Sequence, residues 1–120
     1  MKHLYFKCLL IGILSLGGIK AVANRIVYDC EVDGIYYVLD KTTKTASVTY
    51  KEYRDITGYT HYVSDYAGYI TIPSTFTYDG TEYRVKSIRE HAFEYCNNLI
   101  SVNIPNSVTS IETEAFYGCI

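Results

Sequence analysis

The 120-residue chain contains no tryptophan, only two prolines and one methionine. After residue 23 it has no apolar run long enough to span a bilayer, which excludes a membrane-spanning helix in that part of the chain. It also lacks heptad repeats, low-complexity tracts and proline-rich linkers, which excludes a coiled coil or a disordered linker. Tyrosine, by contrast, is abundant, because 13 of the 14 tyrosines follow residue 23. This composition predicts one small folded domain with an unusual share of tyrosine.

Residues 1–23 have the pattern of a secretory signal peptide. Lys2 and Lys7 form a charged start, an apolar run follows, and residues 21–23, AVA, match an A-x-A cleavage site. Export would leave residues 24–120 with 8 basic and 13 acidic residues, a net charge of −5. Nucleic acid and anionic lipid need clustered lysine and arginine, so both are poor partners. We therefore predict a secreted, extracellular or cell-surface protein with no membrane insertion after cleavage.

The C-terminal segment, residues 85–120, contains one motif twice. Residues 85–96, VKSIREHAFEYC, align without gaps on residues 108–119, VTSIETEAFYGC, at a shift of 23 residues. A period in the low twenties is typical of leucine-rich repeats, in which each copy forms one coil of a solenoid. Solenoids generally need about three repeats and a polar terminal cap. We count one full and one partial repeat and interpret the chain as truncated; the alternative is that an N-terminal β cap stabilises one and a half coils.

Stacked coils place equivalent residues of successive repeats on one another. We therefore expect Phe93 to lie over Phe116 and Ile88 to lie over Ile111. Other apolar residues should also point into the coil: Leu99, Val102, Ile104 and Val108.

These repeats resemble the BspA-type leucine-rich repeats of secreted and surface proteins in gut and oral bacteria. The resemblance rests on residues 104–111, IPNSVTSI, and on residues 115–119, AFYGC. It extends to residues 72–85 through a stretch found in the β-rich caps of such proteins. The fold that we predict is β-rich (α+β): an N-terminal β-hairpin cap over residues 24–84 continues into a leucine-rich-repeat solenoid over residues 85–120, with short convex helical turns.

Two Asp-Gly pairs, at residues 33–34 and 79–80, predict tight type I′ hairpins within the cap, because both residues of such a turn need positive φ. The alternation of apolar and polar residues continues in register from one strand to the other across each turn. It places Cys30 opposite Tyr37 in the first hairpin. Phe76 should likewise oppose Tyr83 in the second. Two further strands are expected, at residues 46–50 and 68–72.

Residues 51–67 show no clear period and are predicted to form a long loop, which in a compact domain is usually functional or disordered. The loop carries four tyrosines that are candidates for partner binding: Tyr53, Tyr59, Tyr62 and Tyr66. Tyrosine combines a flat contact area with a hydroxyl group and is common in binding loops. The alternative, ring by ring, is that these tyrosines pack over the cap. Outward polar residues of the repeats are the other candidates: Lys86, Ser101, Asn103 and Thr109.

The sequence offers little for catalysis or metal binding. There is no glycine-rich phosphate loop, no serine nucleophile elbow and no zinc-type Cys-x-x-Cys or His-x-x-x-His spacing. Cys96 and His91 could form a thiolate–imidazole pair. Four glutamates could supply paired carboxylates for glycoside hydrolysis: Glu90, Glu94, Glu112 and Glu114. We interpret His91 and these glutamates as solvent-exposed, because His91 and Glu90 occupy positions that vary between the two copies, and we predict no catalytic residue, cofactor or metal.

Three cysteines follow the signal segment: Cys30, Cys96 and Cys119. Equivalent residues of neighbouring coils lie about 5 Å apart, which would allow a Cys96–Cys119 disulfide in an exported protein. We favour buried thiols, because cysteine at one position of successive repeats behaves as a small apolar residue.

Three functions remain open from the sequence. The first is a non-enzymatic protein that binds a host extracellular-matrix or cell-surface protein, similar to relatives described as adhesins. The second is a glycan-binding module that uses the tyrosine-rich loop. The third is a secreted hydrolase, for which the sequence supplies no set of catalytic residues.

Overall fold

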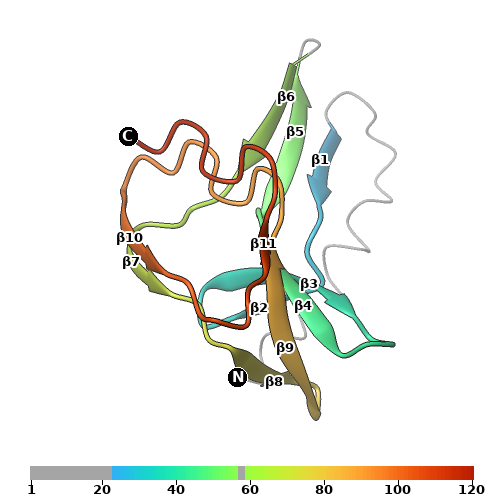
Figure 1. The fold of residues 1–120 in the computed structure, drawn as a ribbon. Helices are drawn as coiled ribbons and strands as arrows, with labels where there is room; N and C mark the ends of the chain where they lie inside the picture. Colours follow the sequence, from blue (N-terminus) through green and yellow to red (C-terminus); the bar gives the residue numbers. More distant parts are fainter. Residues whose placement is uncertain (1–22, 57–58) are drawn as a thin grey trace.

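The computed structural model describes residues 23–56 and 59–120, so the predicted signal peptide lies almost entirely outside the described residues. The described residues form strands joined by turns (Figure 1). The strands are β1 (Ala23–Ile26), β2 (Cys30–Val32), β3 (Ile35–Asp40), β4 (Thr45–Thr49), β5 (Glu52–Ile56), β6 (Tyr59–Val63), β7 (Gly68–Thr71), β8 (Thr75–Tyr78), β9 (Thr81–Ile88), β10 (Leu99–Asn103) and β11 (Ser110–Ile111).

The strands form three sheets. The largest has the order β11-β9-β4-β3-β2, with β8 paired to β9 outside this path. β7 and β10 form a parallel two-stranded sheet, and β1, β5 and β6 form an antiparallel three-stranded sheet. Figure 1 shows that the β5–β6 hairpin projects from the body of the molecule on the same side as the C-terminal turns.

Both predicted hairpins are confirmed. Cys30 pairs with Tyr37 across the first turn, and Phe76 pairs with Tyr83 across the second. Asp33 and Gly34 have φ values of 51° and 82°, and the second Asp-Gly pair has nearly the same values. Positive φ at both turn residues is the geometry that the type I′ turn requires. The predicted strands at residues 46–50 and 68–72 are also present, as β4 and β7.

The core lies where the largest sheet meets the C-terminal turns. Its fully buried side chains include Tyr37, Val48, Val85, Ile88 and Phe93. β4 and β9 run parallel and each contributes alternate residues to this core, while Tyr37 stacks on Phe76 at a ring-centroid distance of 4.2 Å. The core therefore joins the predicted cap to the predicted repeats.

The prediction of a long loop over residues 51–67 is wrong for most of the segment. Residues 52–56 and 59–63 form the β5–β6 hairpin, in which Tyr53 pairs with Tyr62. The tip of this hairpin is exposed, as shown by Tyr59, Thr60 and His61. A ribbon that is solvated near its tip has no need for apolar alternation, and so its sequence lacks the period that identifies half-buried strands.

The predicted helical turns are also wrong, because the described residues contain no helix. Between β9 and β10 the chain forms successive turns in which the backbone N–H bonds three residues back, from Ala92 to Arg89 and from Cys96 to Phe93. His91 and Tyr95 have φ values of 62° and 54°. A left-handed residue at every fourth position prevents the continuous backbone geometry of an α-helix. None of the described residues contributes to a helix that could cross a membrane.

The predicted stacking of the repeats is confirmed where the two copies meet. The rings of Phe93 and Phe116 are parallel to within 1°, with centroids 4.9 Å apart. Ile88 pairs with Ile111 where β11 lies parallel to β9. Two residues that were predicted to point inward are instead exposed, Ile104 and Ile111, because no described segment covers them.

Candidate functional site

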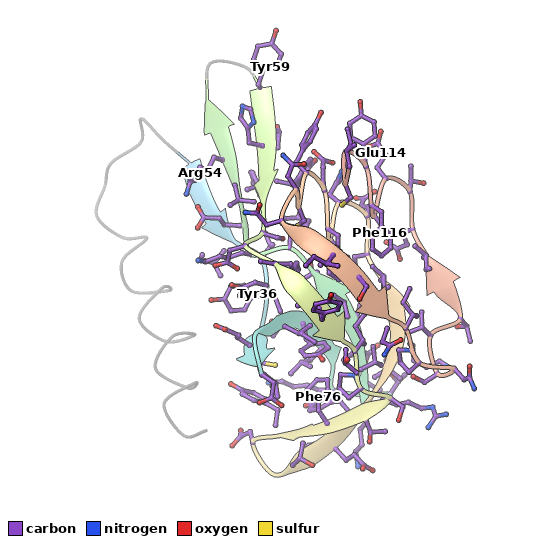
Figure 2. All side chains as sticks on the ribbon, turned by 90° about the vertical axis from the view of Figure 1, so that its left-hand side faces the viewer. Tyr36, Arg54, Tyr59, Phe76, Glu114 and Phe116 are labelled. Atoms are coloured by element: carbon purple, nitrogen blue, oxygen red, sulfur yellow. The ribbon has the colours of Figure 1, made fainter. Side chains whose placement is uncertain are left out.

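The structure separates the four candidate tyrosines. Tyr59 is 71% exposed at the tip of the β5–β6 hairpin (Figure 2), whereas Tyr53 and Tyr62 are half-buried. Tyr66 belongs to the core, so its assignment as a binding residue is corrected. Its hydroxyl accepts a hydrogen bond from the backbone N–H of Tyr36 at 3.0 Å and donates one to the backbone oxygen of Thr49 at 2.8 Å.

The four polar candidates do not share one surface. Ser101 and Asn103 are exposed on β10, in the two-stranded sheet. Lys86 lies on β9 in the largest sheet, where its backbone oxygen accepts a hydrogen bond from the N–H of Thr109 at 2.9 Å. The structure therefore divides these four residues into two pairs: Ser101 and Asn103 on β10, and Lys86 on β9 with Thr109 just before β11.

A groove of about 430 Å³ lies between β6 and the turn at residues 90–96, and we call it the hairpin groove. One hydrogen bond ties its two sides together, from Ser64 Oγ to the backbone oxygen of Ala92 at 3.0 Å. Its lining combines charged, polar and aromatic side chains: Arg54, His61, Tyr62, Val63, Ser64, Glu94 and Tyr95. Of these residues, only Tyr62 had been predicted as a binding candidate.

Two exposed tyrosines beside the hairpin groove were missed as binding candidates. Tyr95 and Tyr117 are 58% and 54% exposed, and their rings meet edge to face with centroids 5.5 Å apart. The backbone N–H of Tyr95 donates to the backbone oxygen of Tyr117 at 2.8 Å. They are not equivalent in the repeat, since Tyr95 aligns with Gly118, and so no repeated tyrosine marked them in the sequence.

Gly118 makes room for this pair. It has a φ of 75°, and a Cβ atom at this position would lie 2.3 Å from Cδ1 of Tyr95. Only glycine meets both conditions without strain, because it tolerates positive φ and has no side chain. Gly118, in the second copy of the repeat, therefore leaves the space that the ring of Tyr95, in the first copy, occupies.

The side chains of His91, Glu94 and Glu114 meet beside the hairpin groove, and we call them the His91 cluster. Nδ1 of His91 hydrogen-bonds the carboxylate of Glu94 and lies 3.6 Å from Oε1 of Glu114. The ring of Tyr62 stacks on the imidazole with centroids 3.8 Å apart and planes 5° apart. The prediction that these residues face solvent is wrong for His91 and Glu94, whose side chains are only 14% and 11% exposed, and right for Glu114.

The electrostatic surroundings of this cluster are negative. Burial raises the pKa of the Tyr62 hydroxyl, and the nearby carboxylates of Glu90, Glu94 and Glu114 raise it further. The cluster can therefore accept hydrogen bonds and attract positive charge.

The cysteines lie in or beside the core. Cys96 and Cys119 carry free thiols, and Sγ of Cys119 donates a hydrogen bond to the backbone oxygen of Phe93 at 2.7 Å. Burial is the main reason that the pKa of Cys96 is raised to about 12. A thiol with this pKa stays protonated near neutral pH, which makes it a poor nucleophile.

We predict that Cys96 in the folded protein resists alkylation by iodoacetamide at pH 8, because the thiolate is the reactive form and the side chain is buried. Alkylation of Cys96 should appear only after addition of denaturant, as measured by mass spectrometry of peptides. Non-reducing digests should contain no Cys96–Cys119 disulfide. Rapid labelling of native Cys96, or a bridge in most molecules, would contradict the buried-thiol interpretation.

The fold is similar to that of a leucine-rich repeat protein of known structure. A crystal structure of a leucine-rich repeat protein from Bacteroides ovatus is similar, with a TM-score of 0.60 and 28% sequence identity. The match covers 77% of this chain and 21% of that protein, so the chain spans about a fifth of the larger structure. A search of curated proteins finds no significant match.

A family model provides the assignment. The model described as "BspA type Leucine rich repeat region (6 copies)" matches residues 54–120, which is more than half of the chain. The match begins within the predicted cap, at β5, and includes both copies of the internal repeat. The chain therefore belongs to the BspA-type leucine-rich repeat family.

Proposed function

We propose that this protein is a non-enzymatic, adhesin-like interaction protein, secreted or held at the cell surface, that binds a host extracellular-matrix or cell-surface protein. Membership of the repeat family supports a role in binding. The signal-peptide pattern of residues 1–23 supports export. The buried and protonated Cys96 thiol argues against use of this residue as a nucleophile.

We further propose that the repeats form a solenoid. Each sheet of the repeat region grows by parallel addition of one strand, β10 on β7 and β11 on β9. An apolar hollow of about 370 Å³ lies at the outer side of the last coil, and its lining includes Leu99, Val102 and Phe116. Such a surface suits a further coil of the same kind. In this arrangement residues 24–84 act as the cap and residues 85–120 as the first repeats.

The observation that carries the binding proposal is a set of exposed tyrosines on the β5–β6 hairpin and the C-terminal turns, of which Tyr95 lines the hairpin groove. Tyr59, Tyr95 and Tyr117 are each more than half exposed. Exposed aromatic residues of this size are typical anchors of interfaces, where a few side chains supply most of the binding energy. Tyr95 and Tyr117 already hold each other edge to face, so less side-chain entropy is lost when a partner binds.

The test is a pair of matched variants. We expect the double substitution Tyr59→Ser and Tyr117→Ser to weaken binding to an immobilised matrix protein by at least about tenfold, since two anchors are lost. Surface plasmon resonance against a panel of host matrix proteins would measure this loss. Both sites avoid the left-handed backbone of Tyr95, where serine would add strain.

Two control variants remove exposed groups from the β7–β10 sheet. Tyr69, on β7, is 77% exposed, and Tyr69→Ser should leave affinity within about twofold. The double substitution Ser101→Ala and Asn103→Ala should have the same small effect. A larger loss of affinity in either control, with folding intact, would place recognition on the β7–β10 sheet and refute the role of the hairpin groove.

A second candidate, glycan binding, is favoured by the lining of the hairpin groove. Its volume of about 430 Å³ lies within the usual range of small-ligand pockets. Arg54, His61 and Ser64 could hydrogen-bond sugar hydroxyls, while Tyr62 and Tyr95 supply aromatic surface. A glycan array would separate the two candidates: binding to defined glycans that is lost in Ser64→Ala would favour the glycan, and binding to deglycosylated matrix protein would favour the protein.

A further inference from the structure

We propose that His91, Glu94 and Glu114 form a binding site for a divalent transition-metal ion, with zinc as the best fit, that joins the two stacked turns of the repeats. This inference does not depend on the proposed function, because it concerns an ion and not a macromolecular partner. It assigns a role to side chains that vary between the repeats and that we had interpreted as exposed.

The donor atoms are close enough for one ion. One imidazole nitrogen and one oxygen from each glutamate all lie within 4.8 Å of one another. With bonds of about 2.0–2.2 Å, two ligands of a tetrahedral zinc ion lie about 3.4 Å apart. The separation of 3.6 Å between His91 Nδ1 and Glu114 Oε1 fits this value. Glu94 now hydrogen-bonds Nδ1 directly, so its side chain must turn aside to admit the ion.

The backbone holds two of the ligands in register. His91 and Glu114 occupy equivalent positions of the repeat and both have positive φ, 62° and 59°. Two backbone hydrogen bonds join their turns, from the N–H of Phe93 to Ala115 at 2.7 Å and from the N–H of Tyr95 to Tyr117 at 2.8 Å. The metal would thus cross-link turns that are already aligned, and little backbone ordering would remain to be done on binding.

The aromatic contact fixes the orientation of the imidazole. Tyr62 stacks on the His91 ring almost in parallel, and the edge of Tyr62 meets Tyr50 at a centroid distance of 5.0 Å. Packing on both rings restricts rotation of the histidine and keeps Nδ1 directed at the two carboxylates. In metal sites, hydrogen bonds to outer groups commonly set the orientation of the imidazole. Here the stacked ring of Tyr62 restricts it.

The charge balance favours a dication. The two carboxylates of Glu94 and Glu114 supply two negative charges, which match the charge of the ion. The arginine that lines the groove, Arg54, has its Nε 2.9 Å from Oε1 of Glu52 and is therefore already paired. Binding of the ion breaks the hydrogen bond between Nδ1 and the Glu94 carboxylate, and any proton on Nδ1 passes to solvent because a metal binds the unprotonated nitrogen.

The donor types select the class of metal. Calcium and magnesium prefer six or more oxygen ligands and are poorly served by one nitrogen and two carboxylates. Imidazole with carboxylates suits zinc, which commonly takes three protein ligands and leaves its fourth position to water. Glu114 is exposed, so solvent can reach this fourth position.

The test is isothermal titration calorimetry of the protein with zinc chloride. We expect one zinc per chain, and a loss of affinity of at least about tenfold in Glu94→Gln and in Glu114→Gln, because each amide is a weaker ligand than the carboxylate. Saturating zinc should also raise the melting temperature of the wild type by at least about 5 °C, and at the same zinc concentration this shift should be smaller in both variants.

Two matched controls isolate the site. Glu90→Gln removes an exposed carboxylate next to His91 that is outside the cluster, and it should keep the affinity within about twofold. Cys119→Ser removes the thiol that could bind zinc instead, and it should also keep the affinity. Circular dichroism of each variant would confirm that the fold is intact.

Three results would overturn the inference. The first is no zinc binding by the wild type at micromolar concentrations. The second is equal binding by the wild type and the two glutamine variants. The third is loss of binding in Cys119→Ser, which would assign the zinc to the thiol. In the first case, the His91 cluster would be an ion pair between stacked turns and no metal site.

Discussion

Replacing Phe93 by alanine is expected to lower the free energy of unfolding by about 3–5 kcal/mol. The side chain is 0% exposed and lies between two other rings. Its centroid is 4.5 Å from that of Tyr66, which precedes β7, and 4.9 Å from that of Phe116 in the second copy of the repeat. Alanine would leave a cavity where these three segments of the chain meet.

Phe116 is the matched control, because it has the same side chain at the equivalent position of the repeat. It is half-buried in the second copy of the repeat, so Phe116→Ala should cost only about 1–2 kcal/mol. The repeat alone predicts equal costs for the two substitutions. Denaturant unfolding of both variants would measure the difference, and a cost below about 1 kcal/mol for Phe93→Ala would contradict the stacked core.

Removing only the hydroxyl of Tyr66 is expected to destabilise the protein by about 2–3 kcal/mol. In Tyr66→Phe the ring remains, but the buried hydroxyl no longer accepts from the N–H of Tyr36 or donates to the oxygen of Thr49. Loss of a buried partner costs about 1–3 kcal/mol for each group left without one. Thermal or denaturant unfolding would measure the effect.

Tyr69→Phe provides the control for this substitution. Tyr69 is exposed on β7, so its hydroxyl is solvated in the folded and the unfolded chain, and the change should stay within about 0.5 kcal/mol. Equal effects at Tyr66 and Tyr69 would show that the buried hydroxyl contributes nothing to stability.

The elements that the sequence predicted correctly depend on short-range signals. Each Asp-Gly pair defines its own hairpin, because the turn requires positive φ at two adjacent residues and the flanking alternation sets the register. The 23-residue repeat likewise predicted the contact of Phe93 with Phe116, because copies of one motif stack in register. The same repeat led to the family to which the chain belongs.

The two errors in the predicted fold have separate physical causes. The β5–β6 hairpin was interpreted as a loop because its exposed ribbon carries no apolar period. The turns were predicted to be helical, whereas left-handed residues interrupt them at His91, Tyr95 and Glu114. No glycine marked these positions, and the apolar pattern of a short turn resembles that of one helical turn.

The sequence by itself determined the two hairpins, the stacking register of the repeats and the family, since each depends on residues close together or on one motif repeated. Only the tertiary structure decided which tyrosines are buried and which are exposed, and brought His91, Glu94 and Glu114 together beside Tyr62. These contacts depend on how the β5–β6 hairpin packs on the turn after β9, and one of the bonds that joins them, Ser64 to Ala92, links residues 28 positions apart. Packing over such a separation is set by the shape of the whole core, and no local period or turn signal in the sequence records it.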